Sequence, residues 1–244
     1  MTTLTSKQAR LAALRPLSPE SVASLAAAWD VRMVFESNSI EGNQLTLRET
    51  ELVLSKGVTV SGKPLKDHLE AVNLSLAWQR VKQLAQPGAQ LSERDLLELH
   101  RMVLTRVEDS FAGCYRTGAV RIAGSSLIPP NPIKVPELMD ALFGSLPDLA
   151  DPVERASKLH HEISRIHPFA DGNGRTARLA MNFVLLAAGY PPISIPTDLR
   201  HDYYLALEAA DAGNFQSWQT FITRQVEQEL DTWLEALESS IPTD

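Results

Sequence analysis

The sequence predicts an all-α fold, a helical bundle that is interrupted by one short β-hairpin. Through most of the chain, apolar residues recur at three- and four-residue spacing, which is the period of an amphipathic helix. Between residues 113 and 136 this period disappears and β-forming residues partly alternate, which favours a hairpin. Residues 174–188 are apolar nearly all round, which indicates a helix buried in the centre of the bundle.

The composition is typical of a globular protein. Of the 244 residues, 44% are apolar and 22% are charged, so a substantial core can form. The net charge of −7 and the absence of a Lys/Arg run argue against a nucleic-acid partner. No apolar run approaches the roughly 18 residues of a membrane span, and the N-terminus lacks the apolar core of a signal peptide. We therefore expect a cytoplasmic protein with no membrane partner. Cys114, the only cysteine, excludes an intramolecular disulfide and is expected to be a small buried hydrophobe.

The N-terminal part is predicted to be helical. Residues 1–17 form a modest leader helix. Ser18 followed by Pro19 is typical of a helix start, with the serine as the cap and the proline in the first turn. This second helix is expected to end at Gly42, because glycine is common just after a helix.

Caps and apolar periodicity mark the further helices. Thr46 ahead of Glu49 is a capping box, and Ser92 caps a helix whose apolar face includes Leu96 and Leu99. A helix before Pro87 is marked by Leu69, Val72, Leu76 and Val81. The others are predicted from Pro136 to Leu146, up to His167, from Gly174 to Ala188, from Tyr203 to Gly213, and through Trp218 to Leu237.

The stretch from His167 to Arg178 reads His-Pro-Phe-Ala-Asp-Gly-Asn-Gly-Arg-Thr-Ala-Arg and suits phosphate binding. A glycine-rich turn at Gly172 and Gly174 leads into a helix. Such a turn points unpaired N–H groups and the positive end of the helix dipole at one place. Arg175 and Arg178 lie three apart on one face of that helix, so both can address the same anion.

The same stretch also contains groups for chemistry. Asp171 offers one hard carboxylate, enough to hold Mg²⁺ when substrate phosphates supply the other ligands. His167 has an ordinary pKa of about 6.5, which suits a base that takes a proton from a hydroxyl. Together these groups indicate transfer from a nucleotide to a hydroxyl.

The same residues also allow other interpretations. Taken singly, His167 is typical of a core histidine and Asn173 of a helix cap. An EF-hand is excluded because Asn182 stands where a Glu is needed. A P-loop is excluded because no Gly-Lys-Ser/Thr follows the glycines. A zinc site joining His160 and His161 to His167 is excluded because they lie roughly 9–10 Å apart along a helix.

The stretch matches the Fic motif, His-x-Phe-x-Asp-Gly-Asn-Gly-Arg-x-x-Arg, at every specified position, and the chain resembles the Fic family over roughly residues 30–225. The resemblance implies a Fic-type helical bundle with a small β-hairpin flap. It implies an enzyme that transfers AMP from Mg·ATP to a Ser, Thr or Tyr hydroxyl of a protein. In that enzyme His167 would be the base and Asp171 the Mg²⁺ ligand. The residues that would bind the nucleotide and its phosphates are Gly172, Asn173, Gly174, Arg175, Arg178, Tyr203 and Tyr204, although paired aromatics are also typical of a core.

A second informative stretch is Ser37-x-x-x-Glu41-Gly42. Ser37 and Glu41 share a helix face. The helix dipole disfavours a Glu at a C-terminus, so Glu41 is either solvated or paired with a group elsewhere. The stretch is similar to the inhibitory motif Ser/Thr-x-x-x-Glu-Gly/Asn of Fic proteins. By that resemblance Glu41 pairs with Arg178 and withholds the group that orients the γ-phosphate. The same Glu could instead align a water that removes AMP from a modified target.

The predicted hairpin has a turn at its centre and prolines on its second arm. Pro129-Pro130-Asn131-Pro132 forbids a helix and leaves an extended edge. The segment resembles the Fic flap, which aligns the target by strand addition. A plain connector is the alternative interpretation. By the resemblance, the residues beside the nucleotide are Gly124, Ser125, Ser126, Leu127 and Ile128.

The predicted organisation has three parts. Residues 1–90 are N-terminal helices, including the inhibitory helix at about 20–42, which pack on a Fic core at 91–225. Residues 226–244 are the end of the C-terminal helix. The expected partners are ATP and a target protein, which could be the chain itself, and a homo-oligomer stays open. AMP removal, transfer from another nucleotide, and a non-catalytic helical phosphate-binding regulator remain alternatives.

Overall fold

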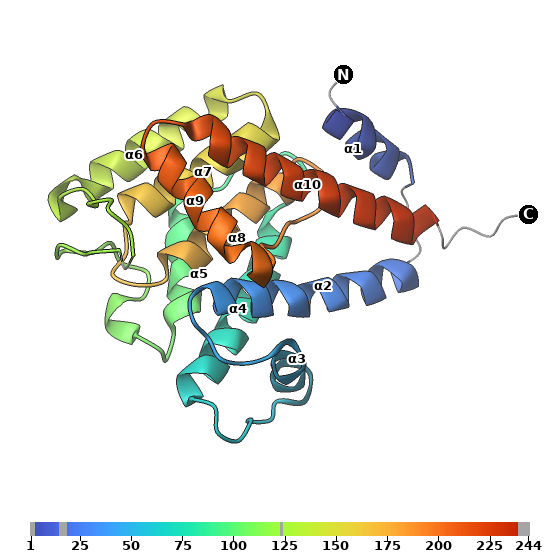
Figure 1. Ribbon diagram of the computed structural model, residues 1–244, viewed down its shortest axis with the longest axis horizontal. Helices are drawn as coiled ribbons and strands as arrows, with labels where there is room; N and C mark the ends of the chain where they lie inside the picture. The colour runs from blue at the N-terminus through green and yellow to red at the C-terminus, as the bar shows by residue number, and fades with distance from the viewer. Residues whose placement is uncertain (1–2, 15–18, 123, 239–244) are drawn as a thin grey trace, which may run out of the picture.

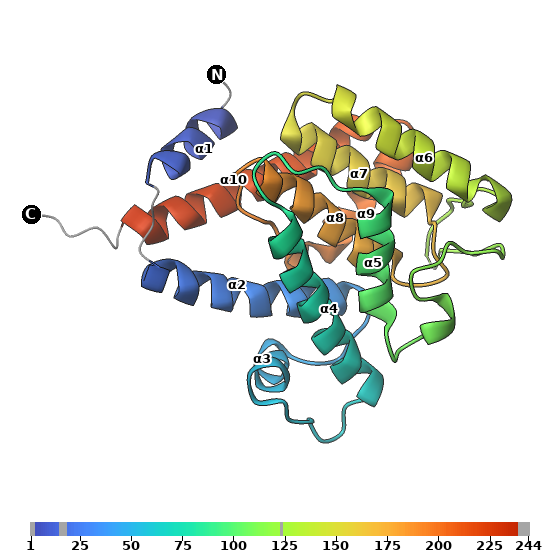
Figure 2. The same cartoon turned by 180° about the vertical axis from the view of Figure 1, so that it is seen from behind.

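The computed structural model describes residues 3–14, 19–122 and 124–238, which form a helical bundle (Figure 1 and, from behind, Figure 2). The α-helices within these ranges are α1 (Thr3–Ala13), α2 (Pro19–Ile40), α3 (Leu47–Lys56), α4 (Leu65–Leu84), α5 (Glu93–Leu104), α6 (Val135–Ser145), α7 (Pro152–Ile166), α8 (Asn173–Ala187), α9 (Arg200–Asp211) and α10 (Phe215–Glu238). Short 3₁₀ helices are η1 (Asp109–Phe111), η2 (Pro132–Lys134), η3 (Leu146–Asp148) and η4 (Thr197–Leu199).

Local sequence signals explain where several helices begin. Thr46 and Ser92 each form the predicted capping box, at the start of α3 and of α5. Asp151 caps α7 by accepting from two backbone N–H groups, and Pro152 occupies the first helical position, where its missing N–H costs nothing. The predicted cap at Ser18 lies outside the described residues.

Helix α8 is the central helix, as its apolar sequence predicts. Every residue from 175 to 185 is buried. The helix packs against α7 on one face and against α4 and α5 on the other, as the two views show (Figures 1 and 2). The last turns of α2 also reach it. The first turn of α8 is therefore enclosed by segments from both ends of the chain.

The N-terminal helices pack on the bundle in different places. Helix α1 lies beside α10, where the Lys7 ammonium bonds Glu227 and Asp231 at 2.9 and 2.8 Å. Helix α2 crosses α4, while α3 stands out at one end of the molecule next to α4 (Figure 1). Within the described ranges, no helix combines the length and the apolar character needed to cross a membrane.

The predicted β-hairpin is wrong: residues 113–136, of which residue 123 is not described, contain turns, irregular chain, a 3₁₀ helix and the start of α6, but no strand. The prolines between residues 129 and 132 lack the N–H groups that a ladder needs. The Arg116 guanidinium holds the two arms instead, donating to the carbonyls of Gly118 and Pro130 at 3.0 and 2.6 Å. A lone two-stranded hairpin is marginally stable in water, so one buried side chain can replace its ladder.

Two side-chain features also differ from what the sequence suggests. The expectation that Cys114 is buried is wrong, because it lies exposed in the short loop after η1. Helix α4 turns Val72 and Leu76 to solvent, 38% and 54% exposed, and buries polar residues on its opposite face. Among them, the Asn73 amide donates to two carbonyls at the end of α5. This polar side chain can be buried because it is hydrogen-bonded.

Candidate active site

The turn between α7 and α8 has an unusual backbone. His167 ends α7 in a left-handed conformation, with φ of 50°, and Gly172 precedes α8 with φ of 76°. A left-handed residue with a Cβ is strained, and such positions concentrate at functional sites. The first helical hydrogen bond of α8 joins the Thr176 N–H to the Gly172 carbonyl. The N–H groups of residues 173–175 therefore have no acceptor within the helix and suit an anion.

A cavity of about 320 Å³ lies over this helix terminus. It is lined by the end of α2, the flap segment, the α7–α8 turn and one face of α9. The predicted site residues that line it are Glu41, Gly124, Ser125, Leu127, His167, Asn173, Gly174, Tyr203 and Tyr204. Those that lie outside its lining are Ser37, Ser126, Ile128, Asp171, Gly172, Arg175 and Arg178.

The His167 imidazole has one defined partner. Its Nδ1 lies 3.3 Å from the Ser164 carbonyl oxygen. Because a carbonyl only accepts, Nδ1 carries the proton and Nε2 is left as an acceptor. Burial lowers the pKa of His167, although the Ser164 carbonyl and the nearby carboxylates oppose this in part. The ring is therefore neutral near pH 7 and can accept a proton at Nε2.

Arg116 is a candidate site residue that the sequence did not reveal. The residue is buried, with 5% of its surface exposed. It donates to the His167 carbonyl at 2.7 Å and to the Ile166 carbonyl at 3.4 Å, besides the two flap carbonyls. Its backbone N–H donates to the Pro168 carbonyl at 2.9 Å. Arg116 thus joins the flap to the turn that carries His167. The only signal in the sequence is an Arg within an otherwise β-like run.

His100, expected to be structural, holds the other end of this turn. The Gly113 N–H donates to its Nδ1 at 2.9 Å, so Nε2 carries the proton and donates to the Asp171 carbonyl at 2.9 Å. The ring is fully buried and stacks on Phe169 with ring centres 3.6 Å apart. Burial lowers the pKa of His100 to about 4, which keeps the ring neutral and fixes this tautomer.

The Asn173 side chain braces the turn from inside. Its Oδ1 accepts from the Phe169 N–H at 2.9 Å, and its Nδ2 donates to the Phe169 carbonyl at 3.0 Å. The amide was expected to hold phosphate, but both of its ends are used by the chain itself. What this position offers to the cavity is therefore the backbone of the first turn of α8.

The ion pair expected between Glu41 and Arg178 is present. Glu41 Oε1 accepts from Arg178 Nη2 at 2.7 Å. Ser37 supports it, because its hydroxyl and carbonyl each accept from Arg178 at 2.8 Å. The Tyr203 hydroxyl lies 3.4 Å from Nη1 of the same guanidinium. Burial alone lowers the pKa of Arg178, but the Glu41 charge and the hydrogen bonds outweigh it, and the pKa is raised.

The Glu41 carboxylate lies directly over the helix terminus. A Cβ added at Gly174 would meet Glu41 Oε1 at 2.3 Å and Arg178 Nη1 at 3.0 Å. Only a residue without a side chain allows this approach. Glu41 therefore places a negative charge against the N-terminus of α8, where a phosphate would otherwise suit.

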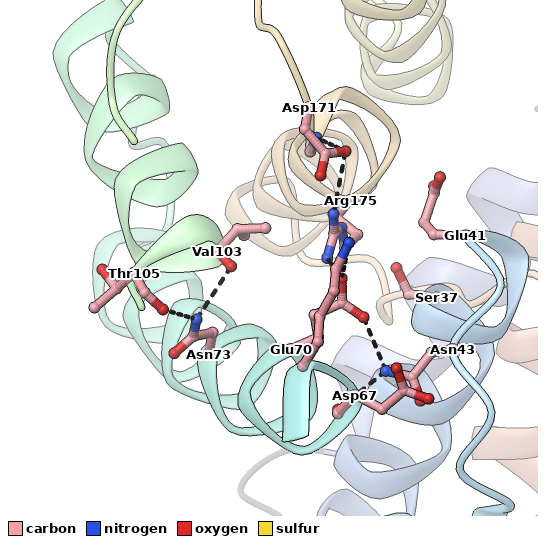
Figure 3. Close-up of polar contacts among 12 residues, drawn as sticks. Ser37, Glu41, Asn43, Asp67, Glu70, Asn73, Val103, Thr105, Asp171 and Arg175 are labelled. Atoms are coloured by element: carbon pink, nitrogen blue, oxygen red, sulfur yellow. Dashed lines mark hydrogen bonds and ion pairs between the residues drawn. The ribbon is translucent and has the colours of Figure 1, made fainter. Parts of the chain in front are cut away.

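Arg175 and Arg178 do not converge on one anion. Arg175 is 2% exposed, and its Nη1 lies 2.9 Å from Glu70 Oε1 while its Nη2 lies 3.5 Å from Asp171 Oδ1 (Figure 3). Asp171 itself is about half exposed. Among the described residues no three His, Cys, Asp or Glu side chains gather into a metal site. A single exposed carboxylate fits Mg²⁺ only when nucleotide oxygens supply other ligands.

The comparisons agree with this geometry. Residues 90–185 match the model of the Fic/DOC family. A protein adenylyltransferase Fic from Nematostella vectensis is 37% identical over 206 residues, which cover 82% of this chain and 48% of that protein. The chain thus spans about half the length of the curated relatives it matches.

Solved structures show the same fold. A crystal structure of a Fic domain-containing signaling protein from Bacteroides thetaiotaomicron has a TM-score of 0.90 and 27% identity to this chain. The match covers 99% of this chain and 100% of that protein. Fic-1 from Caenorhabditis elegans has a TM-score of 0.84 and 28% identity, covering 98% of this chain and 72% of that one. The matched region includes α5 to α7 and the motif at the start of α8. The chain carries a Fic domain of the Fic/DOC family.

Proposed function

We propose that this chain is a protein adenylyltransferase, which transfers AMP from Mg·ATP to a Ser, Thr or Tyr hydroxyl of a target protein. The observation that carries the proposal is the cavity over the N-terminus of α8, with a neutral His167 and the free N–H groups of the first helical turn beside it. The Nematostella vectensis and Caenorhabditis elegans relatives, which are named protein adenylyltransferases, support it.

In this reaction the target hydroxyl attacks the α-phosphorus, the bond to the pyrophosphate oxygen breaks, and pyrophosphate leaves. Nε2 of His167 takes the hydroxyl proton, because Nδ1 is occupied by the Ser164 carbonyl. The N–H groups at the start of α8 stabilise negative charge on the phosphates. Arg178 would bind the γ-phosphate once Glu41 has left it. Mg²⁺, held by Asp171 and phosphate oxygens, would supply further charge neutralisation.

The Glu41–Arg178 ion pair is proposed to hold the enzyme in an inhibited state. Glu41 competes for the same guanidinium and the same helix terminus that the terminal phosphates need. A nucleotide can bind productively only if it displaces this carboxylate. Because Glu41 directly follows α2, any change that moves the end of α2 would release the site.

The flap segment is proposed to bind the target backbone. Gly124, Ser125 and Leu127 border the cavity, and the described residues around them form a turn, in which the Ser125 N–H donates to the Ile122 carbonyl, followed by chain that is not paired in a sheet. A target segment could add to this edge and bring its hydroxyl near His167. Arg116 would keep this edge at a fixed distance from His167.

The test is labelling with ATP that carries ³²P at the α-phosphate, with Mg²⁺ and a protein extract or the chain itself as the target. The arms are wild type, Glu41→Gly, His167→Ala and the Glu41→Gly/His167→Ala double variant. We expect strong label with Glu41→Gly, weak label with wild type, and none when His167 is absent. ATP labelled at the γ-phosphate is the matched control, and it should give no label.

The alternatives give different outcomes. Nucleotide binding without label in every variant would contradict the proposal and favour a phosphate-binding regulator. Loss of label from pre-modified protein, faster with wild type than with Glu41→Gly, would indicate AMP removal assisted by Glu41. Label from CTP or UTP in preference to ATP would identify another nucleotide as the substrate.

A further inference from the structure

A buried carboxylate on α4 lies behind the phosphate-binding helix. The Glu70 side chain is 8% exposed and faces Arg175, whose side chain is 2% exposed, with Oε1 and Nη1 2.9 Å apart. A buried charge is costly unless it is paired, so each of these groups depends on the other. Figure 3 shows Arg175 extended between Glu70 on one side and Asp171 on the other.

The contacts of Asp171 are all made by one oxygen. Oδ1 accepts from the Gly172 N–H at 2.7 Å and lies 3.5 Å from Arg175 Nη2. The carboxylate is thereby oriented through Oδ1, and Oδ2 lies outside these contacts. This orientation leaves Oδ2 for a cation. Metal-binding carboxylates are commonly held in this way, by a hydrogen bond to the oxygen that does not bind the metal.

The charges explain why Glu70 is needed. Arg175 with Asp171 alone would form a complete ion pair, and the guanidinium would compete with a cation for the carboxylate. Arg175, Asp171 and Glu70 together carry one net negative charge, and the Lys66 ammonium, which lies 3.7 Å from Glu70 Oε1 on a side chain that is 60% exposed, is screened by solvent. Nη1 of Arg175 lies closer to Glu70, at 2.9 Å, than Nη2 lies to Asp171, at 3.5 Å. Asp171 therefore keeps its charge while its direction stays fixed.

Glu70 is in turn fixed by the segment that follows Glu41. Asn43 Nδ2 donates to Glu70 Oε2 and to the Asp67 carbonyl, each at 3.0 Å (Figure 3). The Gln44 N–H donates to the Asp67 carboxylate at 2.7 Å. Both oxygens of Glu70 thus have a partner, and one partner lies two residues after the inhibitory glutamate.

We propose that Glu70 is a positioning residue for the metal carboxylate: it binds Arg175 so that Arg175 orients Asp171 without neutralising it. This assigns Arg175 to the support of Asp171 and not to the phosphates. The proposal rests on the proposed function, since it concerns the Mg²⁺ that the nucleotide brings.

The experiment measures binding as well as activity, in the Glu41→Gly background. The ligand is an ATP analogue with a methylene group between the α- and β-phosphates, titrated calorimetrically with and without Mg²⁺. The variants are Glu70→Gln, Arg175→Gln and the double variant. Glu98→Gln is the matched control, since Glu98 forms a Glu–Arg pair with Arg80 away from the site.

We expect Glu70→Gln to raise the Mg²⁺ concentration for half-maximal binding and labelling by about 10–100-fold, the usual loss when a supporting group of a metal ligand is removed. Binding of the metal-free analogue should not change. In the double variant the competing guanidinium is gone and the Gly172 N–H still holds Asp171 Oδ1, so the Mg²⁺ requirement should return part of the way toward that of the Glu41→Gly parent. This rescue would distinguish a positioning role of Glu70 from a loss of folding in the Glu70→Gln variant. The double variant itself should fold, because it leaves no unpaired charge in the buried Glu70–Arg175 pair.

Three results would overturn the inference. One is an unchanged Mg²⁺ requirement in a folded Glu70→Gln variant. Another is weaker metal-free binding by Arg175→Gln, which would return Arg175 to the phosphates. The third is a double variant no better than Glu70→Gln. If the Glu41→Gly parent itself binds no analogue at all, the proposed function fails instead.

Discussion

Removing the contacts between Arg178 and the end of α2 one at a time should raise the labelling rate in steps. Three contacts join them: the Glu41 carboxylate at 2.7 Å, and the Ser37 hydroxyl and carbonyl at 2.8 Å each. Glu41→Gly removes the charged contact and uncovers the terminus of α8. Ser37→Ala removes one neutral contact and leaves the ion pair in place.

The exposure of the pair sets the size of the effect. The Arg178 side chain is 5% exposed but that of Glu41 is 31% exposed. Breaking a fully buried pair costs about 3–5 kcal/mol, and an exposed pair contributes about 0–1 kcal/mol. We place this pair between them, at about 2 kcal/mol, which corresponds to roughly 30-fold in rate. The Ser37 hydroxyl should contribute about 1 kcal/mol, or roughly fivefold, as a typical hydrogen bond does.

The assay is the initial rate of α-phosphate labelling at a fixed, subsaturating concentration of Mg·ATP. Wild type, Ser37→Ala and Glu41→Gly should rank in that order. Ser39→Ala is the matched control, because it makes the same change two residues away on α2, and its rate should equal wild type. Equal rates for wild type and Glu41→Gly, with nucleotide bound to both, would refute the reasoning. A rise of about 10²–10³-fold or more would show that the pair behaves as fully buried, since breaking such a pair costs about 3–5 kcal/mol.

Three further predictions concern the turn between α7 and α8. Because burial lowers the pKa of His167, the labelling rate of Glu41→Gly should be constant above about pH 6.5 and decline only below it; a decline that begins above pH 7 would contradict a buried neutral base. His100, with a pKa of about 4, binds no proton between pH 4 and 6.5 while the unfolded chain does, so its contribution to stability is complete above pH 6.5 and is lost toward pH 4. The free energy of unfolding in urea should therefore fall by about 3 kcal/mol between pH 7 and pH 4.5 because of this group, at about 1.4 kcal/mol per pKa unit, and His100→Phe should lose this part of the fall. Arg116→Lys keeps the charge but loses the guanidinium that donates to four backbone carbonyls. The labelling rate should fall by up to about 10²-fold while the affinity for nucleotide stays unchanged. An unaltered labelling rate would exclude a positioning role for Arg116.

The sequence predicted those parts of the fold that depend on local rules. The capping boxes at Thr46 and Ser92 follow from spacing alone, and the buried α8 follows from its apolar composition. Helix α4 shows the limit of such rules. Its exposed Val72 and Leu76 suggest the wrong buried face, because the face that is buried carries Asn73 and Glu70, whose partners lie far along the chain.

The site divides in the same way. The pairing of Glu41 with Arg178 joins residues 137 positions apart, and only the likeness to the inhibitory motif pointed to it. The expectation that Arg175 and Arg178 address one anion used their shared helix face, but did not account for a buried acid on α4 that takes Arg175. Arg116 was missed because its partners are backbone carbonyls, which every residue carries, so no residue type in the sequence indicates them.

The central claim is that a triphosphate binds at the start of α8, where Glu41 now lies. The most direct measurement is a crystal structure of Glu41→Gly with Mg²⁺ and the α,β-methylene analogue of ATP. We predict phosphate oxygens on the N–H groups of residues 173–175, a terminal phosphate on Arg178, and the α-phosphorus facing Nε2 of His167. Analogue bound elsewhere, with Arg178 still held only by Ser37, would contradict the account.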